Sequence, residues 1–204
     1  MSKSDLDQYF LVYLQEALRD MEVLDNLYPY HNQRHVFEVF SEAIDLGLRS
    51  NLTFEDLKLL GFAAMYHDHG FLYEKNNNEK LGAEFFIDRF KNSADFSELE
   101  LKRVVNMILD TEIDTQTSKP LSINRDSLSA ILQDADLYNL GSQSFFDWSE
   151  RLQRELNIDL DIFLNNQLKF VLMHEFKTPV GEEKYRSTKN QNIEQLKKKI
   201  GLEC

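Results

Sequence analysis

Apolar side chains recur every three or four residues along almost the whole chain, which is the spacing that places them on one face of an α-helix. The first amphipathic segment spans residues 6–18. Its apolar positions are Leu6, Tyr9, Phe10, Tyr13, Leu14, Ala17 and Leu18. Because the same period continues almost to the end of the chain, the pattern predicts an all-α protein.

Capping residues and breaks divide this pattern into eight or nine helices. After Pro29, Asn32 is placed to cap a helix that ends near residue 48, and Thr53 is placed to cap the next one. The Thr178-Pro179 step is predicted to break the chain before the last helix. The later helices are predicted at about 54–66, 79–90, 97–110, 127–140, 144–156, 159–176 and 190–200, with a polar connection over 111–124.

The predicted helix over residues 54–66 is apolar on nearly every side through its middle, from Leu59 to Met65. A helix without a polar face must be covered all round, so we expect it at the centre of a helical bundle. The chain has 204 residues with only 7 glycines and 3 prolines, and it contains no internal repeat and no convincing linker. We therefore expect residues 1–204 to form a single domain.

The net charge of the chain limits which binding partners are expected. The chain carries 35 acidic and 23 basic residues, a formal net charge of −12 at pH 7. Such a surface disfavours nonspecific binding to nucleic acids or membranes, whose phosphates are also negative. The absence of a long apolar stretch and of a signal-peptide core predicts a cytoplasmic protein. Cys204 is the only cysteine, which excludes an intrachain disulfide and a cysteine-rich metal site.

The candidate chemistry lies in the histidines. Four of the five occur as two close groups, His31 with His35 and His67 with His69. Asp68 follows His67 directly at the end of the predicted buried helix, where a carboxylate is costly unless it is paired or binds a metal ion. The doublet is therefore either a buried ion pair or part of a site for a divalent metal ion.

Two further positions would complete such a site. If Asn32 caps its helix, His35 lies in the first turn and can face the bundle interior, whereas His31 lies outside the helix on a loop. This difference predicts a fixed metal ligand at His35 and a mobile proton carrier at His31. A further carboxylate is Asp136, which follows a small residue in an apolar run, and Asp134 is the alternative to it.

Three motifs, in the same order along the chain, resemble those of the HD-domain metal-dependent phosphohydrolases. Tyr30-His31-Asn32-x-x-His35-x-x-x-Val39 is similar to the YHNxxHxxxV segment of HD hydrolases and cyclic-nucleotide phosphodiesterases. Residues 63–68 resemble the apolar helix that ends in the HD pair of these proteins. Ala135-Asp136-Leu137 resembles their ADL or ADR motif.

The resemblance covers about residues 30–140, followed by C-terminal helices over about 144–200, and it implies an all-α HD fold. The ligands that it implies for a divalent metal ion (Mn, Mg, Zn, Fe, Ni or Co) are His35, His67, Asp68 and Asp136. It implies hydrolysis of a phosphoester, of a nucleotide or another small phosphorylated metabolite, by a phosphomonoesterase or a phosphodiesterase. The resemblance also implies that His31, Asp68 and Asp136 are catalytic, with His31 as the proton donor.

Alternatives stay open on the sequence alone. A non-catalytic HD module that binds a nucleotide or a protein would keep the fold, and a second metal ion could share Asp68. His69 is the only histidine between the HD doublet and the last motif, so neither a full second metal site nor di-iron oxygenase chemistry is expected. His69 is predicted either at the rim of the site or behind its ligands, and His174 as a partly buried histidine. Arg34 and Lys75 are the candidates for neutralising a substrate phosphate.

Overall fold

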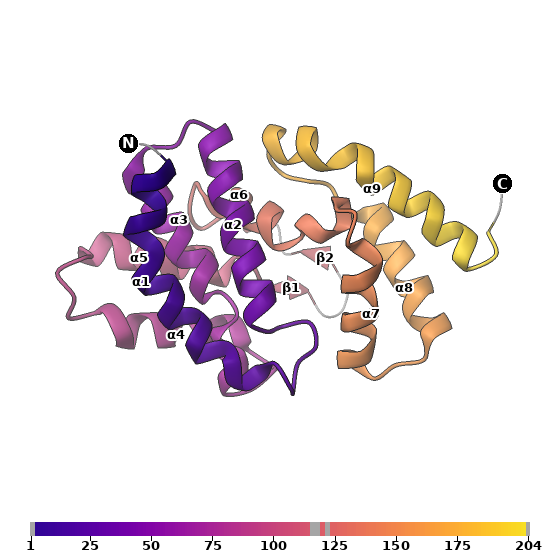
Figure 1. Cartoon of the computed structure of the whole chain (residues 1–204), viewed down its shortest axis with the longest axis horizontal. Helices are drawn as coiled ribbons and strands as arrows, with labels where there is room; N and C mark the ends of the chain where they lie inside the picture. The colour runs from indigo at the N-terminus through magenta and orange to yellow at the C-terminus, as the bar shows by residue number, and fades with distance from the viewer. Residues whose placement is uncertain (1–2, 115–118, 121–122, 203–204) are drawn as a thin grey trace.

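The computed structural model describes residues 3–114, 119–120 and 123–202, which form nine α-helices joined in part by short 3₁₀ turns (Figure 1). The helices are α1 (Lys3–Met21), α2 (Gln33–Arg49), α3 (Phe54–Tyr66), α4 (Asn78–Phe90), α5 (Glu98–Leu109), α6 (Ser129–Asp136), α7 (Phe145–Leu156), α8 (Leu160–Met173) and α9 (Pro179–Lys199). The turns are η1 (Glu22–Leu24), η2 (His69–Leu72) and η3 (Tyr138–Gly141). Within the described ranges no helix has the length and apolar character needed to cross a membrane. Cys204 lies outside these ranges.

The starts of α2 and α3 follow from side chains that accept hydrogen bonds from free backbone N–H groups. The Asn32 side chain accepts from the backbone N of Arg34 at 3.0 Å and of His35 at 3.3 Å. Thr53 accepts from the backbone N of Asp56 at 3.2 Å. Both predicted caps are confirmed, and the cap at Asn32 places His35 in the first turn of α2.

Helix α3 lies at the centre of the bundle, as its apolar sequence predicts. Every residue from Leu59 to Tyr66 is buried, and α3 packs against α1, α2, α4, α5 and α6. The Phe62 ring meets the rings of Phe86, Phe90 and Phe96 edge-on, at centroid distances of 6.3, 5.3 and 4.8 Å. These aromatic contacts fix α4 and the turn before α5 against α3.

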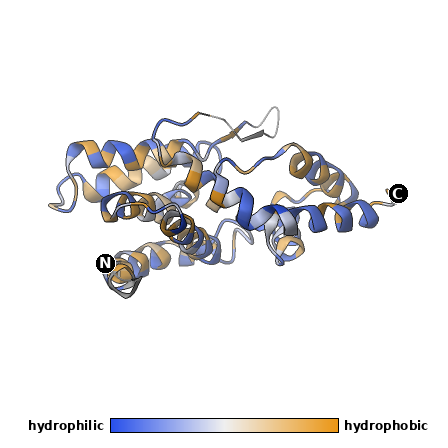
Figure 2. Cartoon of the chain, turned by 90° about the horizontal axis from the view of Figure 1, so that it is seen from above, coloured by the Kyte–Doolittle hydropathy of each residue, from blue (hydrophilic) through white to orange (hydrophobic). Residues whose placement is uncertain are grey.

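The last three helices gather on one side of the molecule and α1–α5 on the other (Figure 1). Helix α9 joins the two groups because it packs against α2, α6 and η3. One hydrophobic cluster runs through both groups, from Leu6 in α1 to Leu196 in α9. Figure 2 shows apolar and polar residues alternating along the helices, which is the amphipathic pattern read from the sequence.

Four segments differ from the sequence prediction. Two helices end earlier than predicted, α6 at Asp136 rather than near residue 140 and α8 at Met173 rather than near residue 176. Helix α9 begins at Pro179 rather than near residue 190, because proline is favoured in the first turn of a helix, where its missing N–H needs no partner. Thr178 caps this start by accepting from the backbone N of Gly181 at 3.0 Å. Within the predicted polar connection, β1 (Ile113–Asp114) pairs antiparallel with β2 (Lys119–Pro120).

Acid should weaken the fold through His174, which follows α8 and is 5 % exposed. Burial, together with the charges of Lys189 and Lys177, lowers the pKa of His174 from 6.5 to about 3. Only the unfolded chain is then protonated at His174 between these two pH values, so the stabilisation is present above about pH 6.5 and is lost as the pH falls below it. At pH 5 the loss from this group is about 2 kcal/mol.

Urea unfolding at pH 7 and pH 5 measures this effect. The free energy of unfolding should fall less between the two pH values in His174→Gln than in the wild type. An equal fall in both proteins would contradict the prediction.

Candidate metal centre

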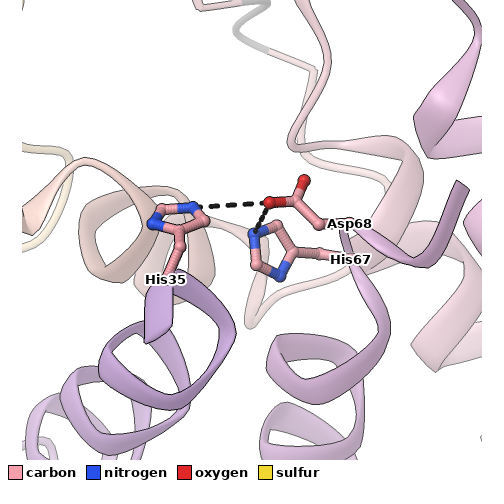
Figure 3. Close-up of side chains that lie close together, drawn as sticks. All are labelled: His35, His67 and Asp68. Carbon is pink, nitrogen blue, oxygen red and sulfur yellow. Dashed lines mark ion pairs between the residues drawn. The ribbon is translucent and has the colours of Figure 1, made fainter. Parts of the chain in front are cut away.

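Three helix ends meet at one buried point of the bundle. His35 lies in the first turn of α2, His67 and Asp68 directly follow α3, and Asp136 is the last residue of α6. The side chains of His35 and His67 are each 1 % exposed, and that of Asp68 is 8 % exposed. Figure 3 shows His35 and the His67–Asp68 doublet pointing toward one another from separate helices.

Nitrogen and oxygen atoms alternate around this point. His35 Nε2 lies 3.1 Å from Asp136 Oδ1 and 3.5 Å from Asp68 Oδ2. His67 Nε2 lies 3.2 Å from Asp68 Oδ2 and 3.5 Å from Asp136 Oδ1. One ligand atom from each of His35, His67 and Asp68 lies within 4.8 Å of the others, so this group could hold a metal ion. The structure thus brings together all four residues that the resemblance assigns to the metal.

The spacing of these atoms fits a divalent ion. Metal bonds of about 2.1 Å to nitrogen and oxygen place neighbouring ligand atoms about 3.0–3.4 Å apart. His67 Nδ1 lies 2.9 Å from the backbone carbonyl of Ala64 and donates to it, which leaves Nε2 to bind a metal ion or a second proton. His67 Nε2 and Asp68 Oδ2 are buried without a hydrogen-bond partner, as expected for atoms that share a cation.

Protons and a metal ion compete for this cluster. Burial lowers the pKa of His67, but Asp68 and Asp136 outweigh burial and hold that pKa well above 6.5. Burial raises the pKa of Asp68, but His67 and the other nearby histidines outweigh burial and lower that pKa to about 2. The pKa of Asp136 is lowered in the same way, against burial, by His35 and His67. Both carboxylates are therefore ionised at neutral pH, and His67 would have to give up a proton to act as a metal ligand.

Removing the metal ion should lower the melting temperature. An ion that binds only the folded chain stabilises it by RT ln(1 + [L]/Kd), about 2.7 kcal/mol at a hundredfold excess over Kd. For a chain of this length that corresponds to roughly 5–10 °C. Melting curves of the metal-loaded protein with and without EDTA measure the shift. Identical curves, from a sample whose metal content has been verified, would argue against an ion in the core.

Two glycines let α4 approach the doublet closely. Gly70 lies in η2, where an added Cβ would lie 1.8 Å from the backbone oxygen of Asn78. In α4 itself, a Cβ on Gly82 would lie 3.0 Å from the backbone oxygen of Tyr66 and 3.1 Å from that of His67. A side chain at either position would push α4 away from the end of α3 and disturb the backbone that carries the candidate ligands.

Asp134 and Asp136 have different surroundings. One oxygen of Asp134 accepts a hydrogen bond from the backbone N of Lys177 at 2.7 Å. Its other oxygen accepts from the backbone N and the hydroxyl of Thr178, at 2.9 and 2.6 Å. Asp134 therefore fastens the start of α9, and Asp136 is the member of the pair that faces His35.

His31 stands beside the cluster and is held from two sides. Its ring stacks on Phe71, with a centroid distance of 4.2 Å and an interplanar angle of 15°. Its Nδ1 lies 2.6 Å from Glu155 Oε1, and Glu155 Oε2 accepts hydrogen bonds from the backbone N of Tyr30 and His31. The sequence predicts a mobile His31, whereas in the structure its ring is held by the carboxylate of Glu155, which is only 2 % exposed.

No feature of the sequence points to Glu155, which lies among polar residues of an amphipathic helix. Burial lowers the pKa of His31, but the hydrogen bond with Glu155 and the charges of Asp68 and Asp136 outweigh burial and raise that pKa above 6.5. The pair with Glu155 therefore shifts His31 toward its protonated form, which is the form that can donate a proton.

His69 does not lie at the rim of the site. Its side chain is fully buried, with ring centroids 4.5 Å from Tyr66 and 5.1 Å from Phe85. The predicted place at the rim is therefore wrong, because His69 turns inward onto Tyr66 and Phe85 rather than toward solvent. A place behind the ligands, which the sequence also allowed, fits its burial directly after the doublet. His174 is likewise buried rather than half-exposed.

Of the two cations proposed for the substrate phosphate, Lys75 lies near the His31–Glu155 pair. Its Nζ lies 3.9 Å from Glu155 Oε1, and its side chain is 42 % exposed. Arg34 instead pairs with Glu38 at 2.7 Å and Asp147 at 3.3 Å, with its guanidinium over the Trp148 ring.

A cavity of about 410 Å³ adjoins the cluster, lined by Asp136 and His31 among others. Much of its remaining wall comes from η3, α7 and α8. Trp148 of α7 lines the cavity, and its ring centroid lies 5.3 Å from that of Tyr30 and 5.7 Å from that of His35. The cavity and the candidate metal centre therefore share a wall, which is the arrangement expected of a substrate pocket.

Comparisons with known proteins support the fold. No protein-family model and no curated protein matches this sequence. In three dimensions the chain is similar to the crystal structure of a predicted HD superfamily hydrolase from an uncultured Thermotogales bacterium, with a TM-score of 0.64 and 17 % sequence identity over 98 % of each chain. At that identity the likeness concerns the fold, and function has to be argued from the site. The chain therefore has the all-α HD-domain fold that its three motifs predict.

Proposed function

We propose that this protein is a metal-dependent phosphohydrolase that cleaves a phosphoester of a nucleotide or another small phosphorylated metabolite. The observation that carries the proposal is that His67 Nε2 and Asp68 Oδ2 are buried and lie 3.2 Å apart but make no hydrogen bond, next to a histidine–glutamate pair. A purely structural ion pair is expected to satisfy its own hydrogen bonds. A module that only binds its ligand has no need of an oriented proton donor.

The proposal gives each residue of the site a separate role. His35, His67, Asp68 and Asp136 would hold the divalent ion. A bound divalent ion activates water and polarises a phosphoryl oxygen. Asp136, which lines the cavity, is placed to accept a hydrogen bond from the attacking water.

Proton transfer belongs to His31. As the water oxygen bonds to phosphorus and the ester P–O bond breaks, the leaving oxygen needs a proton. His31 lines the cavity and is oriented through Nδ1 by Glu155, so its other ring nitrogen is available to supply that proton. Lys75 would offset the charge of the phosphate.

Turnover of a panel of phosphoesters tests the proposal. With one of Mn²⁺, Mg²⁺, Zn²⁺, Fe²⁺, Ni²⁺ or Co²⁺ added, the protein should release inorganic phosphate from a monoester or an alcohol from a diester. Asp68→Asn should release neither. Tight metal binding without any turnover would favour the non-catalytic HD module, and absence of metal binding would overturn the proposal.

A further inference from the structure

The described residues that line the cavity beside the candidate metal centre are mostly apolar or neutral. Among its described lining residues there is no lysine and no arginine, and the ionisable ones are Tyr30, His31, Asp114 and Asp136. Aliphatic and aromatic side chains form most of the rest, including Leu140, Leu152 and Phe170. An anionic group lodged between these apolar side chains, away from His31, would lose its hydration without gaining a counter-ion from the described lining residues.

We propose that this cavity selects the substrate by its non-phosphate part, accepting an uncharged, mainly apolar group of ring size and rejecting a substrate that carries a second phosphate. The inference rests on the proposed function, because the reacting phosphate has to lie at the metal centre. The cavity shares Asp136 and His31 with that centre, so a group attached to the phosphate enters it directly.

The size and the chemistry of the walls support the same class of ligand. A cavity of about 410 Å³ has room for one or two rings beyond the phosphate. Asn166 and Ser149 also line it, and such neutral groups can hydrogen-bond to a heteroatom but cannot neutralise an anion. Burial of a phenylalanine-sized ring strengthens binding by about tenfold to a hundredfold.

Three phosphonates measure this selectivity without being hydrolysed, because their P–C bond is not a phosphoester. Methylphosphonate carries only the head group, phenylphosphonate adds the ring, and 1,4-phenylenediphosphonate adds a second anion to the same ring. Trp148 is the only tryptophan and lines the cavity, so its fluorescence in the Mg²⁺-loaded protein reports binding. Phenylphosphonate should bind at least tenfold more tightly than either of the other two compounds.

The outcomes separate this inference from the proposed function. Equal affinities for methylphosphonate and phenylphosphonate, or a diphosphonate that binds as tightly as phenylphosphonate, overturn the selectivity while leaving a phosphohydrolase in place. Failure of all three to bind to protein that holds its ion overturns the proposed function, and this inference with it.

A charge introduced into the cavity gives a second test. Leu152→Lys should raise the affinity for the diphosphonate, relative to phenylphosphonate, by at least tenfold. The matched control is Leu172→Lys, which adds the same charge to α8 at a side chain that is 54 % exposed and outside the cavity lining. An equal change in both variants would assign the effect to net charge and overturn the inference. If Leu152→Lys does not fold, the affinities of the wild-type protein for the three phosphonates still test the inference.

Discussion

The Asp68→Asn variant should lose its divalent ion and, with it, phosphohydrolase activity. Asp68 Oδ2 lies 3.2 Å from His67 Nε2 and 3.5 Å from His35 Nε2, so it is the oxygen shared by both histidines. Asparagine keeps the shape of the side chain but removes the negative charge that offsets the ion. Because partners outside the coordination shell already change metal affinity by about 10–100-fold, loss of a ligand should exceed a hundredfold.

Metal content and calorimetric titration measure this loss. Asp147→Asn is the matched control, since it removes the same charge from a side chain that is 48 % exposed and pairs with Arg34 and Arg151. The control should bind metal like the wild type, and circular dichroism should show both variants folded. Unchanged metal affinity in Asp68→Asn would remove the doublet from the coordination shell.

Local sequence patterns were enough to predict the helical architecture. An unbroken apolar run such as Leu59–Met65 can only be stable when it is covered on all sides, so the central place of α3 follows from the sequence. Pro179 shows where local reading fails, because proline inside a helix breaks it and proline in the first turn begins it. Only the Thr178 cap and the packing of α9 on α2 and α6 distinguish the two cases.

The candidate ligands were predictable as far as each depended on its own helix. His35 is set by the Asn32 cap, and the His67–Asp68 doublet by the end of an apolar helix. The choice between Asp134 and Asp136 is different, because both lie in the same apolar run of α6. What separates them is the backbone of residues 177–178, which supplies donors to Asp134 and is brought there by the tertiary fold.

Glu155 was beyond the reach of any local pattern. It lies 124 positions from His31 along the chain, and its side chain becomes buried only when α7 packs beside the loop before α2. Residues that orient a functional side chain are brought beside it by the tertiary fold. Trp148 is brought beside His35 in the same way. The sequence therefore pointed to His31 as a candidate proton carrier but not to Glu155, the residue that holds its ring.

His31→Gln should lower kcat for an alkyl phosphoester by about 10²–10⁴, the usual contribution of a general acid. His31 is not part of the His35–His67–Asp68 group, so the metal content should stay at the wild-type level. A nitrophenyl ester should be affected far less, because its leaving oxygen departs without a proton. Loss of the metal in His31→Gln would make His31 a ligand instead.

Glu155→Gln tests whether the carboxylate acts through His31. In the wild type, the hydrogen bond with Glu155 helps to raise the pKa of His31 against the effect of burial. The glutamine side chain could still accept a hydrogen bond from the backbone N of Tyr30, but it would no longer raise the pKa of His31. The protonated form of His31 would then be lost at a lower pH, so the alkaline limb of the pH–kcat profile should move to lower pH.

Glu150→Gln, at a side chain of α7 that is 70 % exposed, removes the same charge and should leave the profile unchanged. A profile that moves equally in both variants would reflect net charge, whereas a profile that moves in neither would leave Glu155 a purely structural role. A shift confined to Glu155→Gln, with the metal retained, would identify His31 as the general acid and Glu155 as the residue that positions it.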